Sequence, residues 1–450
     1  MAWRTLAFFR RSRDSALEGD LQVIYNRGTR FSASARHAEA LYWYESALAI
    51  DPDYANAHYG CGAALAELGR HEEAACCFER AYSLSAEFVN AYYGRAVCLT
   101  ALNRHAEAIA CYDQVLARRP DSVDALYGRA LCFLASGDLP RGFEGLEYRD
   151  RLPHQKSHVM SFPSKAWWGD ASLANKTILL HLDGGFGDAI QFVRFAPLLA
   201  ERGARVILRL PAKLLALMRD EPFVYQAVSE DEPLPQHDFH CPLVRLPLVL
   251  GTTLDTIPAS RCYLRADAAR VLEWSKRLGL QRAARVGLAW AGSKRNRFYD
   301  GRRSIPLEAL KSLADLDCEL ISLQRPIPKA DRTAIRAMPR LNLLGESLKD
   351  FAEIAAVIEN LDLVIAVDSS IAHLAGALGK PVWLLLCYTP DWRWLTDRTD
   401  SPWYPSARLF RQNTPGDWSS VVADVKRAWW AMHDRVPRHS LETVECQDHK

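Results

Sequence analysis

The sequence predicts an α-helical solenoid followed by an α/β part with two parallel-sheet lobes. Residues that recur every 34 positions in the first third of the 450-residue chain predict the solenoid. From residue 178 onward, short apolar runs alternate with helical patterns, which predicts parallel sheets. Residues 363–386 read in order as strand, turn, helix and strand. We therefore expect a helix N-terminus at the carboxyl edge of a sheet, where α/β proteins bind ligands.

Composition excludes several classes of protein. The formal net charge is only +2, so no general field favours nucleic acid. The eleven cysteines form no Cys-x-x-Cys pair, which is typical of a reducing compartment. No stretch approaches the roughly 18 to 20 apolar residues of a membrane span, and the first residues lack a signal-peptide cleavage site. We expect a cytoplasmic protein with tails at residues 1–20 and 436–450, the second of them polar and disordered.

Small and aromatic positions keep one 34-residue phase across residues 21–150. The series are Gly28, Gly62, Ala96, Ala130; Ala40, Ala74, Ala108, Gly142; Tyr44, Phe78, Tyr112, Leu146; and Ala47, Ala81, Val115. Pro52 and Pro120 fall where the chain leaves a second helix. This pattern resembles the tetratricopeptide repeat family in four units, the last of which is interrupted by Pro140 and caps the array.

Such arrays bind extended peptides or proteins in a concave groove, so the resemblance implies a protein or peptide partner. The alternative is a purely structural docking arm. Tyr59, Tyr93 and Tyr127 recur in the same phase, and either lining the groove or packing between repeats would produce their spacing.

The amino-terminal lobe is expected over residues 151–282, beginning with a linker packed by aromatic residues. A strand at residues 178–182 leads into Asp183-Gly184-Gly185-Phe186-Gly187-Asp188 and then a helix. The glycine spacing does not fit a dinucleotide fingerprint, which argues against a nicotinamide enzyme. His237, His240 and Cys241 lack a second ligand pair, so a zinc site is not predicted.

Gly187-Asp188-Ala189-Ile190, with Pro197 ending the helix, resembles the amino-terminal motif of the heptosyltransferase-like glycosyltransferases. The resemblance implies that Asp188 is the base that takes the acceptor proton, whereas the structural alternative is a helix cap. Gly185 and Gly187 would border the cleft. Gln191 and Arg194, one turn further, would face either this cleft or solvent.

The carboxyl-terminal lobe is expected over residues 283–435. A strand ending at Trp290 precedes Ser293 and a cationic loop that contains Arg297. Arg303-Ser304-Ile305-Pro306 resembles the basic element with which the same family holds donor phosphates, so Arg303 is a candidate phosphate ligand. Lys294 and Asn296 stand where the family often has proline and histidine, which leaves the role of Arg297 open.

The stretch DSSIAHLAGALGKP, residues 368–381, resembles the last nucleotide-sugar motif of that family. Asp368 ends a strand, and Ser369 and Ser370 are good N-cap residues for a helix of small residues. Backbone N–H groups and the helix dipole there suit a phosphate. His373 lies one turn inside the helix and would bind the diphosphate or a sugar hydroxyl; the alternative is a core histidine bonded to a backbone carbonyl.

Together the resemblances imply a GT-B fold, with two Rossmann-like domains, after the repeats. The implied activity is an inverting, metal-independent transfer of sugar from a nucleotide-diphosphate sugar to a hydroxyl, without a cofactor. Asp315 and Asp317 resemble a metal motif but precede a strand. The aromatic loops at 390–394 and 401–405 would stack on a ligand or pack, and the last helix, 418–430, would cross back to the first lobe. The alternative function is a noncatalytic scaffold with a vestigial nucleotide-binding domain.

Overall fold

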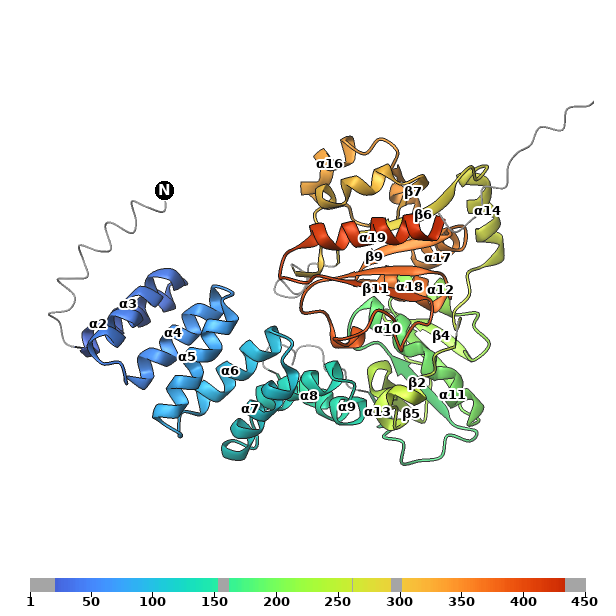
Figure 1. Cartoon of the computed structure of the whole chain (residues 1–450). Helices are drawn as coiled ribbons and strands as arrows, with labels where there is room; N and C mark the ends of the chain where they lie inside the picture. The colour runs from blue at the N-terminus through green and yellow to red at the C-terminus, as the bar shows by residue number, and fades with distance from the viewer. Residues whose placement is uncertain (1–20, 153–161, 261, 293–301, 434–450) are drawn as a thin grey trace, which may run out of the picture.

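The computed structural model describes residues 21–152, 162–260, 262–292 and 302–433. Helices α2 to α5 extend away from the α/β part, the turn between α6 and α7 touches it, and α8 and α9 lie against it (Figure 1). The predicted fold class, helical repeats followed by parallel-sheet lobes, is confirmed.

Eight helices among the described residues form four antiparallel pairs. They are α2 (Leu21–Ala33), α3 (His37–Ile50), α4 (Ala55–Glu67), α5 (His71–Leu84), α6 (Val89–Ala101), α7 (His105–Arg118), α8 (Val123–Ala135) and α9 (Leu139–Leu146). The aromatic rings of Tyr44 on α3, Phe78 on α5 and Tyr112 on α7 fill the space beside small residues of the next pair. A Cβ at Gly60, for example, would lie 2.8 Å from the Tyr44 ring. This contact explains why the small and aromatic positions share one period.

The fourth pair joins the repeats to the α/β part. Helix α9 is short and is followed by the 3₁₀ helix η1 (Glu147–Arg151). Its Phe143 belongs to the same hydrophobic core as Phe192 of the first lobe and Trp392 of the second. The last unit therefore caps the array against the next domain, as predicted.

The first lobe is a five-stranded parallel sheet of order β1-β5-β2-β3-β4. Its strands are β1 (Lys165–Ala166), β2 (Thr177–His181), β3 (Arg205–Leu210), β4 (Gln226–Ser229) and β5 (Phe239–Pro242). Its helices are α10 (Phe186–Phe192), η3 (Val193–Phe195), α11 (Ala196–Glu201), α12 (Ala212–Met218), η4 (Leu243–Arg245), α13 (Leu246–Val249) and η5 (Leu254–Thr256). The next helix, α14 (Ala268–Leu278), packs on α17 (Phe351–Glu359) of the second lobe. The prediction that Pro197 ends α10 is wrong. Pro197 lies in the first turn of α11, where the N–H that proline lacks would have no helical partner.

The second lobe is a six-stranded parallel sheet of order β11-β10-β9-β6-β7-β8. Its strands are β6 (Ala284–Ala289), β7 (Cys318–Ser322), β8 (Asn342–Leu343), β9 (Leu363–Val367), β10 (Val382–Leu386) and β11 (Ala407–Arg411). Its helices are η6 (Leu307–Asp315), η7 (Lys329–Asp331), α16 (Arg332–Arg336), η8 (Gly345–Ser347), α17 (Phe351–Glu359), α18 (Ser370–Ala377), η9 (Trp392–Trp394) and α19 (Trp418–His433).

The last helix does not cross back to the first lobe, which corrects the sequence-based expectation. Val421, Val425 and Trp429 of α19 belong to the core of the second lobe, and the helix packs on η6 and β11. Instead, α10 and α18 pack against each other and join the lobes. Within the residues that the structure describes, no helix combines the length and the apolar composition needed to cross a bilayer.

Candidate active site between the lobes

The first turns of α10 and α18 meet where the two lobes join. A Cβ at Gly187 would lie 2.8 Å from His373 Cδ2 and 3.7 Å from the Ser370 Cα. Only glycine allows this approach without displacing the imidazole. The amino-terminal and carboxyl-terminal motifs, far apart in sequence, therefore form one site.

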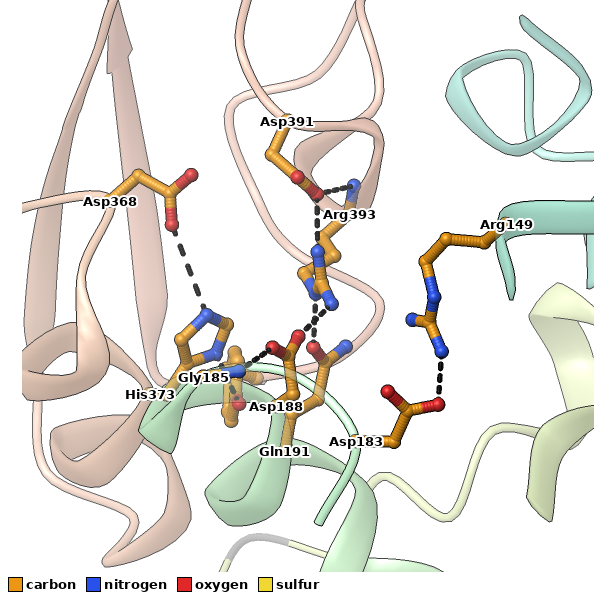
Figure 2. A network of polar contacts seen from close by, with 10 residues as sticks. Arg149, Asp183, Gly185, Asp188, Gln191, Asp368, His373, Asp391 and Arg393 are labelled. Atoms are coloured by element: carbon orange, nitrogen blue, oxygen red, sulfur yellow. Dashed lines mark hydrogen bonds and ion pairs between the residues drawn. The ribbon is translucent and has the colours of Figure 1, made fainter. Parts of the chain in front are cut away.

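Asp188 lies in the first turn of α10 and uses both carboxylate oxygens (Figure 2). Its Oδ2 accepts the Gly185 N–H at 2.6 Å, and its Oδ1 forms an ion pair with Arg393 of the other lobe. The structural role considered for Asp188, a cap, is thus present in the fold. The ion pair also ties the carboxylate to a loop that the sequence motifs did not include.

Arg393 is the centre of the polar network in Figure 2. Besides Asp188, its guanidinium contacts Asp391 at 2.8 Å and donates through Nε to the Gln191 side-chain oxygen. Burial alone lowers the pKa of Arg393, but Asp391 and Asp188 raise it above its ordinary value, so this group stays charged. The cation is thus shared between the lobes.

Neither Gln191 nor Arg194 faces solvent. Gln191 is 0% exposed and Arg194 is 2% exposed. Arg194 donates to the Gln191 carbonyl, to the Trp403 carbonyl at 2.6 Å and to the Tyr263 hydroxyl at 2.9 Å. These contacts make Arg194 a brace between the lobes.

The predicted phosphate ligands are brought together at the start of α18. Arg303 Nη1 donates to the Asp368 carbonyl oxygen at 2.9 Å. Ser369 is the N-cap residue; its hydroxyl is buried and accepts or donates no hydrogen bond within the described part of the chain. Ser370 is the first residue of the helix and is partly exposed. A guanidinium, a buried hydroxyl and helix N–H groups form a cradle suited to phosphate oxygens.

His373 is 5% exposed and lies below this cradle. Its Nδ1 is 2.7 Å from the Tyr404 hydroxyl, and its ring stacks on Trp394. Its Nε2 is 3.8 Å from Asp368 Oδ1, so this nitrogen points toward the end of β9. Burial, followed by nearby arginine charges, holds the pKa of His373 well below its usual value, so the ring is neutral at pH 7. The polar partner is a hydroxyl rather than the backbone carbonyl considered above, and contact with a ligand stays a prediction.

Two candidates, Ser293 and Arg297, lie outside the described residues. Asp315 of the Asp-Leu-Asp sequence forms an ion pair with Lys426 at 3.0 Å. Among the residues that the structure describes, no group of three or more His, Cys, Asp or Glu side chains is arranged to hold a metal ion.

The sequence motifs missed the residues that surround Asp188. The tryptophans and Tyr404 of the two aromatic loops are buried. Of the two alternatives for these loops, stacking on a ligand or packing in the core, the structure shows packing. Arg393 stands between two of these tryptophans. The available signal was a basic residue between two aromatic residues, because a cation that is buried with its neighbours needs a carboxylate partner.

Family models match both parts of the chain. Residues 33–69 match a TPR repeat model, residues 62–110 and 101–149 match a tetratricopeptide repeat model, and residues 329–419 match glycosyltransferase family 9 (heptosyltransferase). The chain is also 26% identical over 326 residues to protein FlbA of Caulobacter vibrioides, which covers 66% of this chain and 53% of FlbA. It therefore spans about half the length of that relative.

Solved structures resemble one part or the other. The glycosyl transferase family 9 protein from Veillonella parvula is 12% identical with a TM-score of 0.41, covering 59% of this chain and 91% of its own. YrrB, described as a TPR protein with an unusual peptide-binding site, is 21% identical with a TM-score of 0.29, covering 33% and 75%. MamA from Desulfovibrio magneticus is 23% identical with a TM-score of 0.29, covering 30% and 77%. The chain thus joins residues 33–149, which match tetratricopeptide repeat models, to an α/β part in which residues 329–419 match glycosyltransferase family 9 (heptosyltransferase).

Proposed function

We propose that the protein is an inverting glycosyltransferase that moves a sugar from a nucleotide-diphosphate sugar to an acceptor hydroxyl. One observation carries the proposal: a carboxylate on α10 and a phosphate cradle on α18 meet at the contact between Gly187 and His373. Attack by a hydroxyl on a carbon that bears a diphosphate needs a base on one side and cationic or N–H groups on the other.

The reaction is a single displacement at the anomeric carbon. The acceptor oxygen forms the new carbon–oxygen bond as its proton passes to Asp188. The bond between the anomeric carbon and the phosphate oxygen breaks, and its electron pair leaves with the nucleoside diphosphate. Arg303 and the N–H groups at Ser369 and Ser370 stabilise that charge, so the proposed step uses neither a metal ion nor a cofactor. A single displacement inverts the configuration of the sugar.

The repeats provide the second element, an acceptor or partner surface. Tyr59 and Tyr93 pack partly against Phe78 and Tyr112, yet both keep exposed surface. A cavity of about 400 Å³ lies beside Tyr93, between α6, α7 and α8. Tyr127, the third tyrosine of this series, lies close enough to Asp188 and Arg393 to interact with their charges. We propose that a protein or peptide binds this face. All ten cysteines in the described residues are free, which supports the proposed cytoplasmic location.

The rival function is a noncatalytic scaffold. The observation that favours it is the double engagement of Asp188, which caps Gly185 and pairs with Arg393. Each carboxylate oxygen has a second lone pair, so these contacts do not prevent proton transfer.

Calorimetry of the full chain with UDP, GDP, ADP, CDP and TDP tests the proposal. We expect one diphosphate to bind more tightly than its nucleoside. Product analysis with the corresponding sugar donors should then show transfer or slow donor hydrolysis with release of that diphosphate. Binding without any turnover, or no binding of any nucleoside diphosphate, would contradict the proposed enzyme and favour the scaffold.

A further inference from the structure

The last helical repeat packs against both elements that carry the Asp188–Arg393 ion pair, α10 and η9. We propose that this repeat is a structural part of the catalytic centre, with Phe143 and Arg393 as positioning residues for Asp188. This inference rests on the proposed function, because it assigns a role in that reaction. It predicts that the repeats do more than bind a partner.

Among the described residues, Arg393 is the hydrogen-bond and ion-pair partner of Asp188 Oδ1. Its side chain is 12% exposed, and its guanidinium also contacts Asp391 and Gln191. A planar guanidinium with several fixed donors sets the direction of each partner, which a flexible ammonium does not. Arg393 therefore fixes the rotation of the Asp188 carboxylate, while Gly185 holds its other oxygen.

One ring of the last repeat packs against a residue near each half of the ion pair. Phe143 of α9 is 2% exposed and packs edge to face against Phe192, at 6.4 Å between centroids, and against Trp392, at 5.5 Å. Phe192 ends the helix that carries Asp188, and Trp392 precedes Arg393. The guanidinium of Arg393 also lies over the rings of Trp392 and Phe192. The size of Phe143 thus affects the separation of α10 from η9.

Further contacts hold the second-lobe loop against the array. Asn103 Nδ2, at the turn after α6, donates to the Tyr388 carbonyl at 2.6 Å, and Thr389 Oγ1 donates to the Ala101 carbonyl at 2.7 Å. Helix α8 packs directly on η9. The segment that leads into Arg393 is consequently fixed by the third and fourth repeats as well as by its own lobe.

The test compares full-length variants. Phe143→Leu removes the shared ring, and Phe78→Leu is its matched control: Phe78 is equally buried in the second repeat but has no part in the core that contains Trp392. Arg393→Ala removes the cation, and its control is Arg398→Ala, which breaks a surface ion pair with Asp400 in the same loop. For each variant, kcat, the affinity for the preferred nucleoside diphosphate and the melting temperature are measured.

We expect Phe143→Leu and Arg393→Ala to lower kcat at least tenfold while the diphosphate affinity stays within twofold of wild type. Arg393→Lys should recover part of the lost kcat, because lysine keeps the charge but not the several fixed contacts. Both controls should keep the wild-type kcat, although Phe78→Leu should lower the melting temperature about as much as Phe143→Leu.

Two results would overturn the inference while leaving the proposed function intact. If Phe143→Leu behaves like Phe78→Leu, the last repeat is only an arm. If Arg393→Ala weakens diphosphate binding, Arg393 is a phosphate ligand rather than a positioning residue. A wild-type protein that transfers no sugar would instead contradict the proposed function and, with it, any catalytic role of the repeat. Amide exchange in α10 would still show whether Phe143→Leu loosens that helix and Phe78→Leu does not.

Discussion

Replacing Asp188 by asparagine separates a base from a helix cap. The amide keeps one oxygen, which can still accept the Gly185 N–H that is now 2.6 Å from Oδ2. Its NH₂ group then faces Arg393, which has lost an anionic partner. Because asparagine and aspartate are about equally good as caps, a purely structural Asp188 would lose little by this change.

The two roles differ in the expected magnitude. In the variant, the NH₂ group of the asparagine and the guanidinium of Arg393 are both donors and cannot bond to each other. This mismatch should lower the free energy of unfolding by about 1–3 kcal/mol. Loss of a positioned base should lower transfer by about 10²-fold or more. That loss equals about 2.7 kcal/mol of activation free energy, at 1.36 kcal/mol per tenfold. The affinity for the nucleoside diphosphate should stay nearly unchanged, because the proposed phosphate site lies at the start of α18.

The assay measures kcat, diphosphate affinity by calorimetry and denaturant unfolding for the same preparation. Asp267→Asn is the matched control, because Asp267 also caps a helix, accepting the Arg270 N–H at 2.8 Å at the start of α14, which packs on α17. We expect the control to keep its transfer rate. Equal losses of binding and turnover in Asp188→Asn, or no loss of turnover at all, would refute the assignment of Asp188 as the base.

Three other substitutions test the phosphate site, the His373 contact and the response to acid. Arg303→Ala should weaken binding of the diphosphate about tenfold or more but leave binding of the nucleoside unchanged, since in the proposed site the guanidinium contacts only the phosphates. If calorimetry gives the variant and the wild type the same diphosphate affinity, Arg303 is not a phosphate ligand. Tyr404→Phe removes the hydroxyl 2.7 Å from His373 Nδ1 and should cost about 1–3 kcal/mol in denaturant unfolding, and an unchanged midpoint would contradict a structural contact. Burial, followed by the charge of His240, lowers the pKa of His181 to about 3 in the folded protein. In the unfolded chain this histidine is protonated below about pH 6.5, so the free energy of unfolding falls as the pH drops below that value. His181→Leu should therefore reduce the loss of stability between pH 7 and pH 5, and an equal loss in both proteins would contradict this.

Much of the fold was predictable because its signals are local. The 34-residue period exists because each repeat packs the same small residue against the same kind of ring, as Gly60 does against Tyr44. Buried parallel strands such as β9 and β10 read as apolar runs because both faces are covered. The contact of Arg303 with the start of α18 was also predictable, since parallel strands end at the same edge of a sheet.

The tertiary structure decided which distant residues pair with each other, because no local sequence pattern relates them. Asp188 and Arg393 are 205 residues apart in sequence and belong to different lobes, so neither position predicts the other. The direction of α19 depended on which of two apolar sheets offered it a complementary surface, and its tryptophans fit the second. Amino-acid sequence alone determined the two kinds of architecture and the chemistry at each sheet edge. Only packing between the parts decided that one phenylalanine of the last repeat, Phe143, contacts both lobes, because such a contact depends on the assembled surfaces of three separate units.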